Sequence, residues 1–83
     1  MSNGYSQVMR TEIDNKLTRD YVFADFTQAW AWMNQVASLA EEHNHHPYWT
    51  NIYNRVHIEL TTHDAWDIVT DKDWELARAI DKI

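Results

Sequence analysis

Alternation of apolar and polar residues is most regular over residues 55–62. Side chains of an extended strand point alternately to its two faces, so one face of this segment is apolar and the other polar. The apolar positions are Val56, Ile58 and Leu60, and the polar ones are His57, Glu59 and Thr61. With residues 49–52 before it and Tyr53-Asn54 as a turn, the segment predicts a hairpin. Residues 8–23 predict a second hairpin, with its turn at Asp14-Asn15.

Apolar residues recur at helical spacing after Asp25. The stripe is centred on Ala29, Met33, Val36 and Ala40, with Trp30 and Ala37 along one edge and Trp32 and Leu39 along the other. Asp25 stands three residues before Gln28, the spacing of a capping box, so the helix should begin there. Pro47 disfavours helical geometry at the preceding residue, so the helix should end over residues 43–45. Either the core covers this wide stripe, or one tryptophan edge faces another subunit.

A second helix is predicted after Thr70, which forms another capping pair with Asp73. Its apolar positions are Leu76, Ala77, Ile80 and Ile83. The order strand, strand, helix, strand, strand, helix predicts an α+β two-layer sandwich: a four-stranded antiparallel sheet with both helices packed on one face. We expect residues 8–83 to form a single domain and residues 1–7, which contain the only glycine, to form a loose arm.

Charge and composition narrow the class of protein. The net charge of −6 argues against binding to nucleic acid through phosphate neutralisation. The first residues lack the pattern of a signal peptide, and no apolar run could span a bilayer, so we expect a cytoplasmic protein without a membrane partner. Cysteine is absent, which removes disulfides and thiolate chemistry. Five tryptophans and four tyrosines in 83 residues favour stabilisation as a homo-oligomer.

Candidate chemistry gathers around histidines, which can give and take protons near neutral pH. Three of them stand where the first helix meets the proline, in Glu41-Glu42-His43-Asn44-His45-His46-Pro47, and another stands in Thr62-His63-Asp64. His45, His46 and His63 lie at the ends of elements, where side chains can converge on a pocket. His57 is about 20 Å from His63 along a straight strand, so we interpret it as a solvated or cross-strand residue. His43 is interpreted as a packed or capping residue.

Metal binding is the alternative use of such a cluster. Three histidines with an open coordination position would suit zinc. However, the His-x-His and His-His spacings lack the helical His-x-x-x-His arrangement of common zinc motifs, so we expect no metal. A histidine-rich metal carrier would be recognised by stoichiometric metal in the purified protein.

The spacing Glu41-x-x-x-His45-His46-Pro47, followed by Tyr53, Thr62-His63-Asp64 and Asp73, resembles the signature of pterin-4a-carbinolamine dehydratases. The resemblance runs from about Leu17 to the C-terminus. It implies an enzyme that needs no metal or cofactor and removes water from 4a-hydroxytetrahydropterin to give quinonoid dihydropterin. This reaction recycles tetrahydrobiopterin, the cofactor of aromatic amino-acid hydroxylases.

The same resemblance implies roles for individual residues. His45, His46 and His63 would be catalytic. Loss of the 4a-hydroxyl needs one group that gives a proton and one that takes a proton, so we hypothesise that His63 is the acid at the hydroxyl and His45 the base, with His46 orienting the substrate. Pterin-contacting or pocket-shaping positions would be Glu41, Asn44, Pro47, Trp49, Thr61, Thr62 and Asp64. The family also implies a homodimer that extends the sheet, or a homotetramer paired again through the long helix.

Two features keep a second interpretation open. Trp66-Asp67 stand where relatives often have glycines, so the loop over residues 65–69 could reshape access to the pocket. Relatives of this fold also serve as dimerisation cofactors for a homeodomain transcription factor through an exposed helix face. The stripe edged by Trp30 and Trp32 could serve a protein partner in the same way, which would make the chain a non-catalytic dimerisation or protein-binding module.

Overall fold

The computed structural model of the chain describes residues 11–13 and 15–83. Its elements are β1 (Thr11–Ile13), β2 (Lys16–Val22), α1 (Phe26–His43), β3 (Tyr48–Ile52), β4 (Arg55–Leu60), a 3-10 turn η1 (His63–Ala65) and α2 (Asp71–Asp81). The expected arm over residues 1–7, the first residues of the first expected strand and Asp14 of its turn lie outside the described residues. Within the described residues, no helix is long and apolar enough to cross a membrane.

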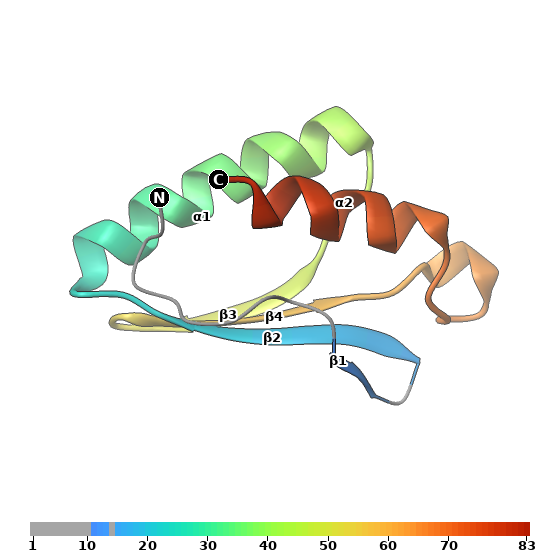
Figure 1. Cartoon of the computed structure of the whole chain (residues 1–83), viewed down its shortest axis with the longest axis horizontal. Coiled ribbons are helices and arrows are strands. Elements are labelled where there is room, and N and C mark those ends of the chain that lie inside the picture. Colours follow the sequence, from blue (N-terminus) through green and yellow to red (C-terminus); the bar gives the residue numbers. More distant parts are fainter. Residues whose placement is uncertain (1–10, 14) are drawn as a thin grey trace.

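The sheet is antiparallel, with the spatial order β1-β2-β4-β3. Its body is three-stranded, because the described part of the fourth strand, β1, amounts to three residues paired with the edge of β2. Both helices lie over the same face of the sheet (Figure 1), which confirms the predicted α+β class. Strand β4 ends at Leu60, two residues before the predicted end at Thr62, because Thr62 instead pairs with Ile68 in an isolated bridge.

Alternation along the strands places the core between the sheet and the helices. Val56, Ile58 and Leu60 are buried, as their spacing predicts. On α1 the four residues at the centre of the stripe are buried too, and Trp32 joins them with its ring centroid 4.3 Å from that of Tyr21. Trp30 is 51% exposed. The two tryptophan edges therefore differ, since Trp32 belongs to the core and Trp30 faces solvent.

Helix α1 begins and ends where the sequence predicts. The Asp25 carboxylate accepts a hydrogen bond from the backbone N–H of Gln28 at 2.9 Å, which satisfies a donor that the first turn leaves unpaired. At the other end Asn44 adopts the left-handed conformation, with φ 49° and ψ 44°, a conformation that asparagine tolerates better than most residues. The chain then leaves the helix through His45 and His46.

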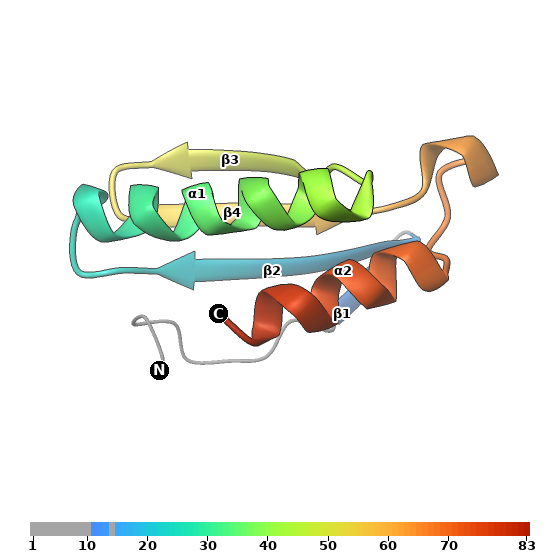
Figure 2. The same ribbon diagram turned by 90° about the horizontal axis from the view of Figure 1, so that it is seen from above.

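Helix α2 begins with the predicted capping box between Thr70 and Asp73. It lies beside α1 over the sheet, as the view from above shows (Figure 2). Its buried face carries Leu76, Ala77 and Ile80, and Asp73 shares that face with no exposed surface. A carboxylate buried on an apolar face needs hydrogen-bond partners, and these partners are found at the candidate site.

Candidate active site

A polar depression of about 280 Å³ lies where the end of α1, the segment after β4 and the first turn of α2 meet. Its lining residues are Asn44, His45, His46, Thr61, Thr62, His63, Asp64 and Lys72. Seven of the ten site residues predicted from the sequence are among them. The fold thus brings together two histidines from the exit of α1 and a third from η1, although 16 residues or more separate them in the chain.

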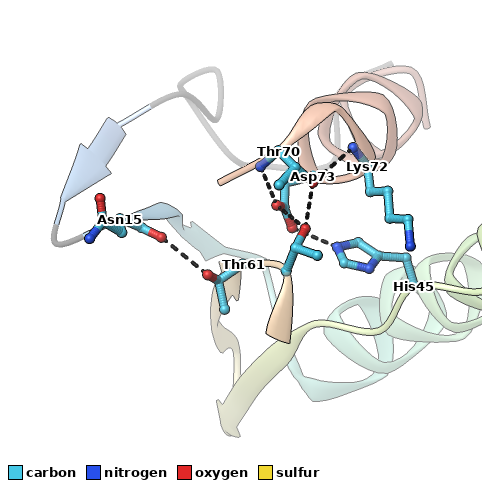
Figure 3. A network of polar contacts seen from close by, with 7 residues as sticks. Asn15, His45, Thr61, Thr70, Lys72 and Asp73 are labelled. Atoms are coloured by element: carbon cyan, nitrogen blue, oxygen red, sulfur yellow. Dashed lines mark hydrogen bonds and ion pairs between the residues drawn. The ribbon is translucent and has the colours of Figure 1, made fainter. Parts of the chain in front are cut away.

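His45 is anchored by the buried carboxylate of Asp73. The distance from His45 Nε2 to Asp73 Oδ1 is 2.6 Å, and the His45 side chain is only 10% exposed. The other carboxylate oxygen, Oδ2, accepts from the backbone N–H of Thr70 at 2.8 Å and from the hydroxyl of Thr62 at 2.7 Å. Three donors therefore converge on Asp73 from three segments of the chain (Figure 3).

The direction of each hydrogen bond fixes the tautomer of His45. The Thr62 hydroxyl donates to Asp73, so it accepts from the Thr70 hydroxyl at 2.6 Å. Thr70 Oγ1 in turn accepts from the backbone N–H of Lys72 at 3.3 Å. An ionised carboxylate only accepts hydrogen bonds, so Nε2 of His45 carries a proton toward Asp73, and in the neutral form of the ring the lone pair is at Nδ1. The ring makes no second hydrogen bond within the described part of the chain, so Nδ1 can accept a proton from a ligand.

His46 is held in a more exposed setting. Its Nε2 lies 2.7 Å from Oε2 of Glu41, one turn back on α1, and both side chains are more than half exposed. Glu41 does not line the depression itself. Its place in the predicted site is therefore indirect, through the orientation that it gives to the His46 ring.

His63, on the turn η1, lines the depression and stands largely in solvent. Its side chain is 90% exposed, and Nδ1 lies 2.9 Å from Oδ1 of Asp67. The hydrogen bond to Asp67 raises the pKa of His63 above its ordinary value of 6.5, and the charges of Asp67 and Asp64 act in the same direction. This arrangement favours the protonated ring, which is the form needed by a general acid.

The loop that carries His63 is closed at its base by Thr62. The backbone N–H of Thr62 donates to the Ile68 carbonyl at 2.9 Å, and the Thr62 carbonyl accepts from Asp67 at 3.1 Å. Trp66 and Asp67 at the tip have φ angles of 65° and 59°. Glycine adopts such angles without steric cost, so both side chains here are held on a backbone that favours glycine.

Three of the predicted site residues lie outside the lining of the depression. Trp49 packs half-buried against the core, Pro47 follows the exit of α1, and Glu41 contacts His46. Three residues that contact the site were missed by the sequence as site residues: Lys72, Asp67 and Asp73. A signal for Asp73 did exist, because it occupies the apolar stripe of α2, where a carboxylate must find partners.

His57 lies on the sheet face away from the helices, since it alternates with buried Val56 and Ile58. Its Nδ1 is 2.7 Å from Asp20 on the paired strand β2, and its Nε2 is 2.9 Å from Glu59. These contacts confirm the cross-strand interpretation. The hydrogen bond to Glu59, with that to Asp20, raises the pKa of His57, and His57 in turn lowers the pKa of Glu59.

A metal centre was the alternative for the histidine cluster. Over residues 11–13 and 15–83, no group of three or more His, Cys, Asp or Glu side chains is arranged to hold a metal ion. His45 and His46 instead direct Nε2 to carboxylates, and His63 directs Nδ1 to one.

The amino-acid sequence is similar to those of several curated bacterial proteins. A curated protein of Synechococcus sp. that carries the provisional name pterin-4-alpha-carbinolamine dehydratase is 53% identical over 68 residues, which are 82% of this chain and 72% of that protein. A Solibacter usitatus protein with the same provisional name is 51% identical over 73 residues, or 88% and 76% of the two chains.

Two solved structures share the fold. The crystal structure of a transcriptional coactivator/pterin dehydratase from Brucella melitensis matches with a TM-score of 0.81 and 39% identity, over 87% of this chain and 78% of that one. A pterin dehydratase-like protein identified as a RuBisCO assembly factor in the alpha-carboxysome matches with a TM-score of 0.76, over 98% and 94% of the two chains. At 19% identity, the second likeness is one of fold alone. The sequence model of the family described as pterin 4 alpha carbinolamine dehydratase matches residues 7–83, and the chain belongs to this family.

Proposed function

We propose that the chain dehydrates 4a-hydroxytetrahydropterin to quinonoid dihydropterin, in the recycling of tetrahydrobiopterin in the cytoplasm. The observation that carries the proposal is that two unlike histidines line one depression. His45 is largely buried and fixed by Asp73 with Nδ1 left available, whereas His63 is exposed and its pKa is raised by Asp67. A dehydration needs one group that takes a proton and one that gives a proton.

In the proposed reaction His63, as imidazolium, gives its proton to the 4a-hydroxyl oxygen. The C4a–O bond breaks, and its electron pair leaves with the oxygen as water. His45 removes the N5 proton through Nδ1, and the N5–H electron pair forms the C4a=N5 double bond of the quinonoid product. His46 orients the ring, and Asn44, Thr61, Thr62 and Asp64 offer polar atoms to its edges. Proton return from His45 to His63 through water completes the cycle without metal or cofactor.

A stopped-flow ultraviolet assay of 4a-hydroxytetrahydropterin dehydration tests the proposal. We expect acceleration over the uncatalysed reaction that chelator leaves unchanged, and a fall in kcat of about 10²- to 10⁴-fold in His63→Ala with little change in substrate binding. An unchanged kcat in this variant would remove His63 from the acid role. Loss of activity with chelator, together with stoichiometric metal, would favour a metal protein instead.

The assembly is part of the same proposal. We expect residues 8–83 to act as one domain that associates into a homodimer or a homotetramer, because a chain of this size needs stabilisation beyond its own core. Light scattering at micromolar concentration measures the mass directly. A single monomeric peak would contradict the proposed association.

A second candidate function, binding of a protein partner, is favoured by one observation. Phe26 and Trp30 are 45% and 51% exposed on the first turns of α1, and their rings stack with centroids 6.1 Å apart. Such a pair on a helix is typical of a contact surface. If the native chain does not accelerate dehydration but a partner copurifies and is lost in Trp30→Ala, this candidate replaces the enzyme.

A further inference from the structure

Trp66 is the most exposed large apolar residue in the described part of the chain, at 91%, against 75% for Ile52. Its backbone is left-handed, with φ 65° and ψ 36°. A residue with a β carbon meets a steric penalty in this region that glycine avoids. Since the indole is almost wholly in solvent, packing within the described residues does not offset that penalty.

Asp67, the next residue, provides the contrast. It is also left-handed, with φ 59°, but its carboxylate holds the ring of His63. The backbone conformation at Asp67 is thus compensated by a contact at the candidate site. Strained positions that persist in folded proteins gather at ligand sites. No contact within the described residues offsets the backbone strain at Trp66, so we look for a ligand that would contact its side chain.

The depression itself lacks a wall for a flat ring. Among the described residues that line it, none carries a phenyl, phenol or indole ring. Its threonine, asparagine, histidine and lysine groups suit the polar edges of a heterocycle, whereas the π face of such a ligand would be left in water. Bicyclic heterocycles gain most from aromatic side chains that cover that face.

Trp66 follows in the chain shortly after the residues that form one side of the depression. Its backbone N–H donates to the carbonyl of His63 at 3.1 Å, and His63 and Asp64, earlier in the same turn, line the depression. The base of the loop is fixed by the bridge between Thr62 and Ile68. The indole is therefore carried by a braced turn next to the site, and at 91% exposure little packing holds it away from a ring bound there.

We propose that Trp66 is a specificity-determining residue, whose indole stacks on the open face of the pterin ring held at the histidines. This inference rests on the proposed pterin substrate and deepens it. Stacking on the indole favours ligands with a flat or nearly flat bicyclic ring. The polar side chains that line the depression then bind the edges of that ring. Stacking also gives the left-handed tryptophan the compensating contact that it lacks in the free chain.

The test compares three variants at one backbone position. Trp66→Gly and Trp66→Asn both suit the left-handed conformation and remove the ring, whereas Trp66→Phe keeps an aromatic face. KM and kcat come from the dehydration assay, and Kd comes from the fluorescence of a non-reacting oxidised pterin. We expect both ring-removing variants to raise KM and Kd roughly tenfold, within the range of base stacking on aromatic side chains, with kcat within about twofold. Trp66→Phe should recover most of the binding.

A control separates specific stacking from adhesion to any exposed aromatic ring. Tyr53→Gly removes an exposed aromatic ring that also stands on a left-handed backbone and does not line the depression, and it should leave KM and Kd unchanged. Thermal melts check folding, and neither Trp66→Gly nor Trp66→Asn should lower Tm, because both relieve the backbone conformation.

The outcomes distinguish this inference from the proposed function. If the native chain turns over substrate but Trp66→Gly and Trp66→Asn keep its KM and Kd, the stacking role is wrong and the dehydratase stands. If the native chain binds the pterin without turnover and the two variants lose binding, the stacking role stands and the dehydratase is wrong. If the native chain neither binds nor turns over, both are wrong.

Discussion

Two clusters of histidine and carboxylate lie on opposite sides of the sheet, and they use the imidazole differently. At the end of α1, Nε2 of His45 is hydrogen-bonded to buried Asp73, and Nδ1 is left available at the depression. On the sheet face away from the helices, both ring nitrogens of His57 are hydrogen-bonded, one to Asp20 and one to Glu59. The first ring is oriented with one nitrogen left available, whereas the second contacts a carboxylate on both sides.

The size of the neighbouring hollow does not separate the two clusters. The hollow beside His57 measures about 390 Å³, more than the 280 Å³ at His45. However, His57 is the single imidazole among the described residues that line it. What marks the smaller site is the convergence of three histidines, one of which keeps a lone pair. Anchoring through one nitrogen, with the other left available, is thus the feature that distinguishes the histidines of the proposed site from His57.

The largest expected difference between the two clusters is in the kcat of the matched substitutions His45→Gln and His57→Gln. A glutamine at position 45 can still donate to Asp73 but cannot take a proton, so kcat should fall by about 10²- to 10⁴-fold. At position 57 the same change should leave kcat and KM within about twofold. The dehydration assay measures both variants, and equal losses in the two would erase the distinction.

The anchor is tested next, by Asp73→Asn. An amide at this position turns one acceptor oxygen into a donor and favours the other tautomer of His45, so we expect kcat to fall about 10- to 100-fold, as is typical for groups that orient a functional histidine. Unfolding free energy should drop by about 1–3 kcal/mol, because buried donors lose their acceptor. Asp71→Asn, in the exposed first turn of the same helix, is the control. A stable Asp73→Asn with native kcat would contradict the role of the anchor.

A smaller effect is expected at the acid, from Asp67→Asn. Asp67 raises the pKa of His63, so its neutralisation should bring that pKa back toward 6.5. Since the acid works protonated, the alkaline limb of kcat/KM against pH should move to lower pH in the variant. Asp64→Asn should move the limb in the same direction but less, because Asp64 acts through charge alone. A limb that stays in place would assign it to another group.

The smallest effect concerns stability at the structural cluster. The pKa of His57 is raised from 6.5, so its contribution is complete below pH 6.5 and is lost as the pH rises through the folded value. The pKa of Glu59 is lowered from 4.5, so its contribution is present above pH 4.5 and is lost as the pH falls. His57→Gln should therefore cost less than about 1 kcal/mol, mainly between these values. Denaturant unfolding at pH 5.5 and 8.5 checks this, and an equal cost at both would refute the linkage.

Local patterns predicted most of the fold because their causes are local. The cap at Asp25, the exit forced by Pro47 and the alternation around Ile58 each involve residues close in sequence. The contact between His45 and Asp73 spans 28 residues and depends on how α2 packs beside α1, so no spacing rule contains it. The capping role of Asp73 was predicted, but its second carboxylate oxygen had no assigned partner. Likewise, the exposure of Trp66 follows from the geometry of the closed loop rather than from its residue type.

The most direct measurement is a nuclear magnetic resonance spectrum of the imidazole nitrogens, recorded with ¹⁵N-labelled histidine while a non-reacting oxidised pterin is added. We predict that His45 is neutral with its proton on Nε2, and that the ring signals of His45, His46 and His63 shift on binding while those of His57 do not. A ligand-induced shift at His57 alone, or a proton on Nδ1 of His45 in the free chain, would contradict the assignment of the depression as the dehydratase site.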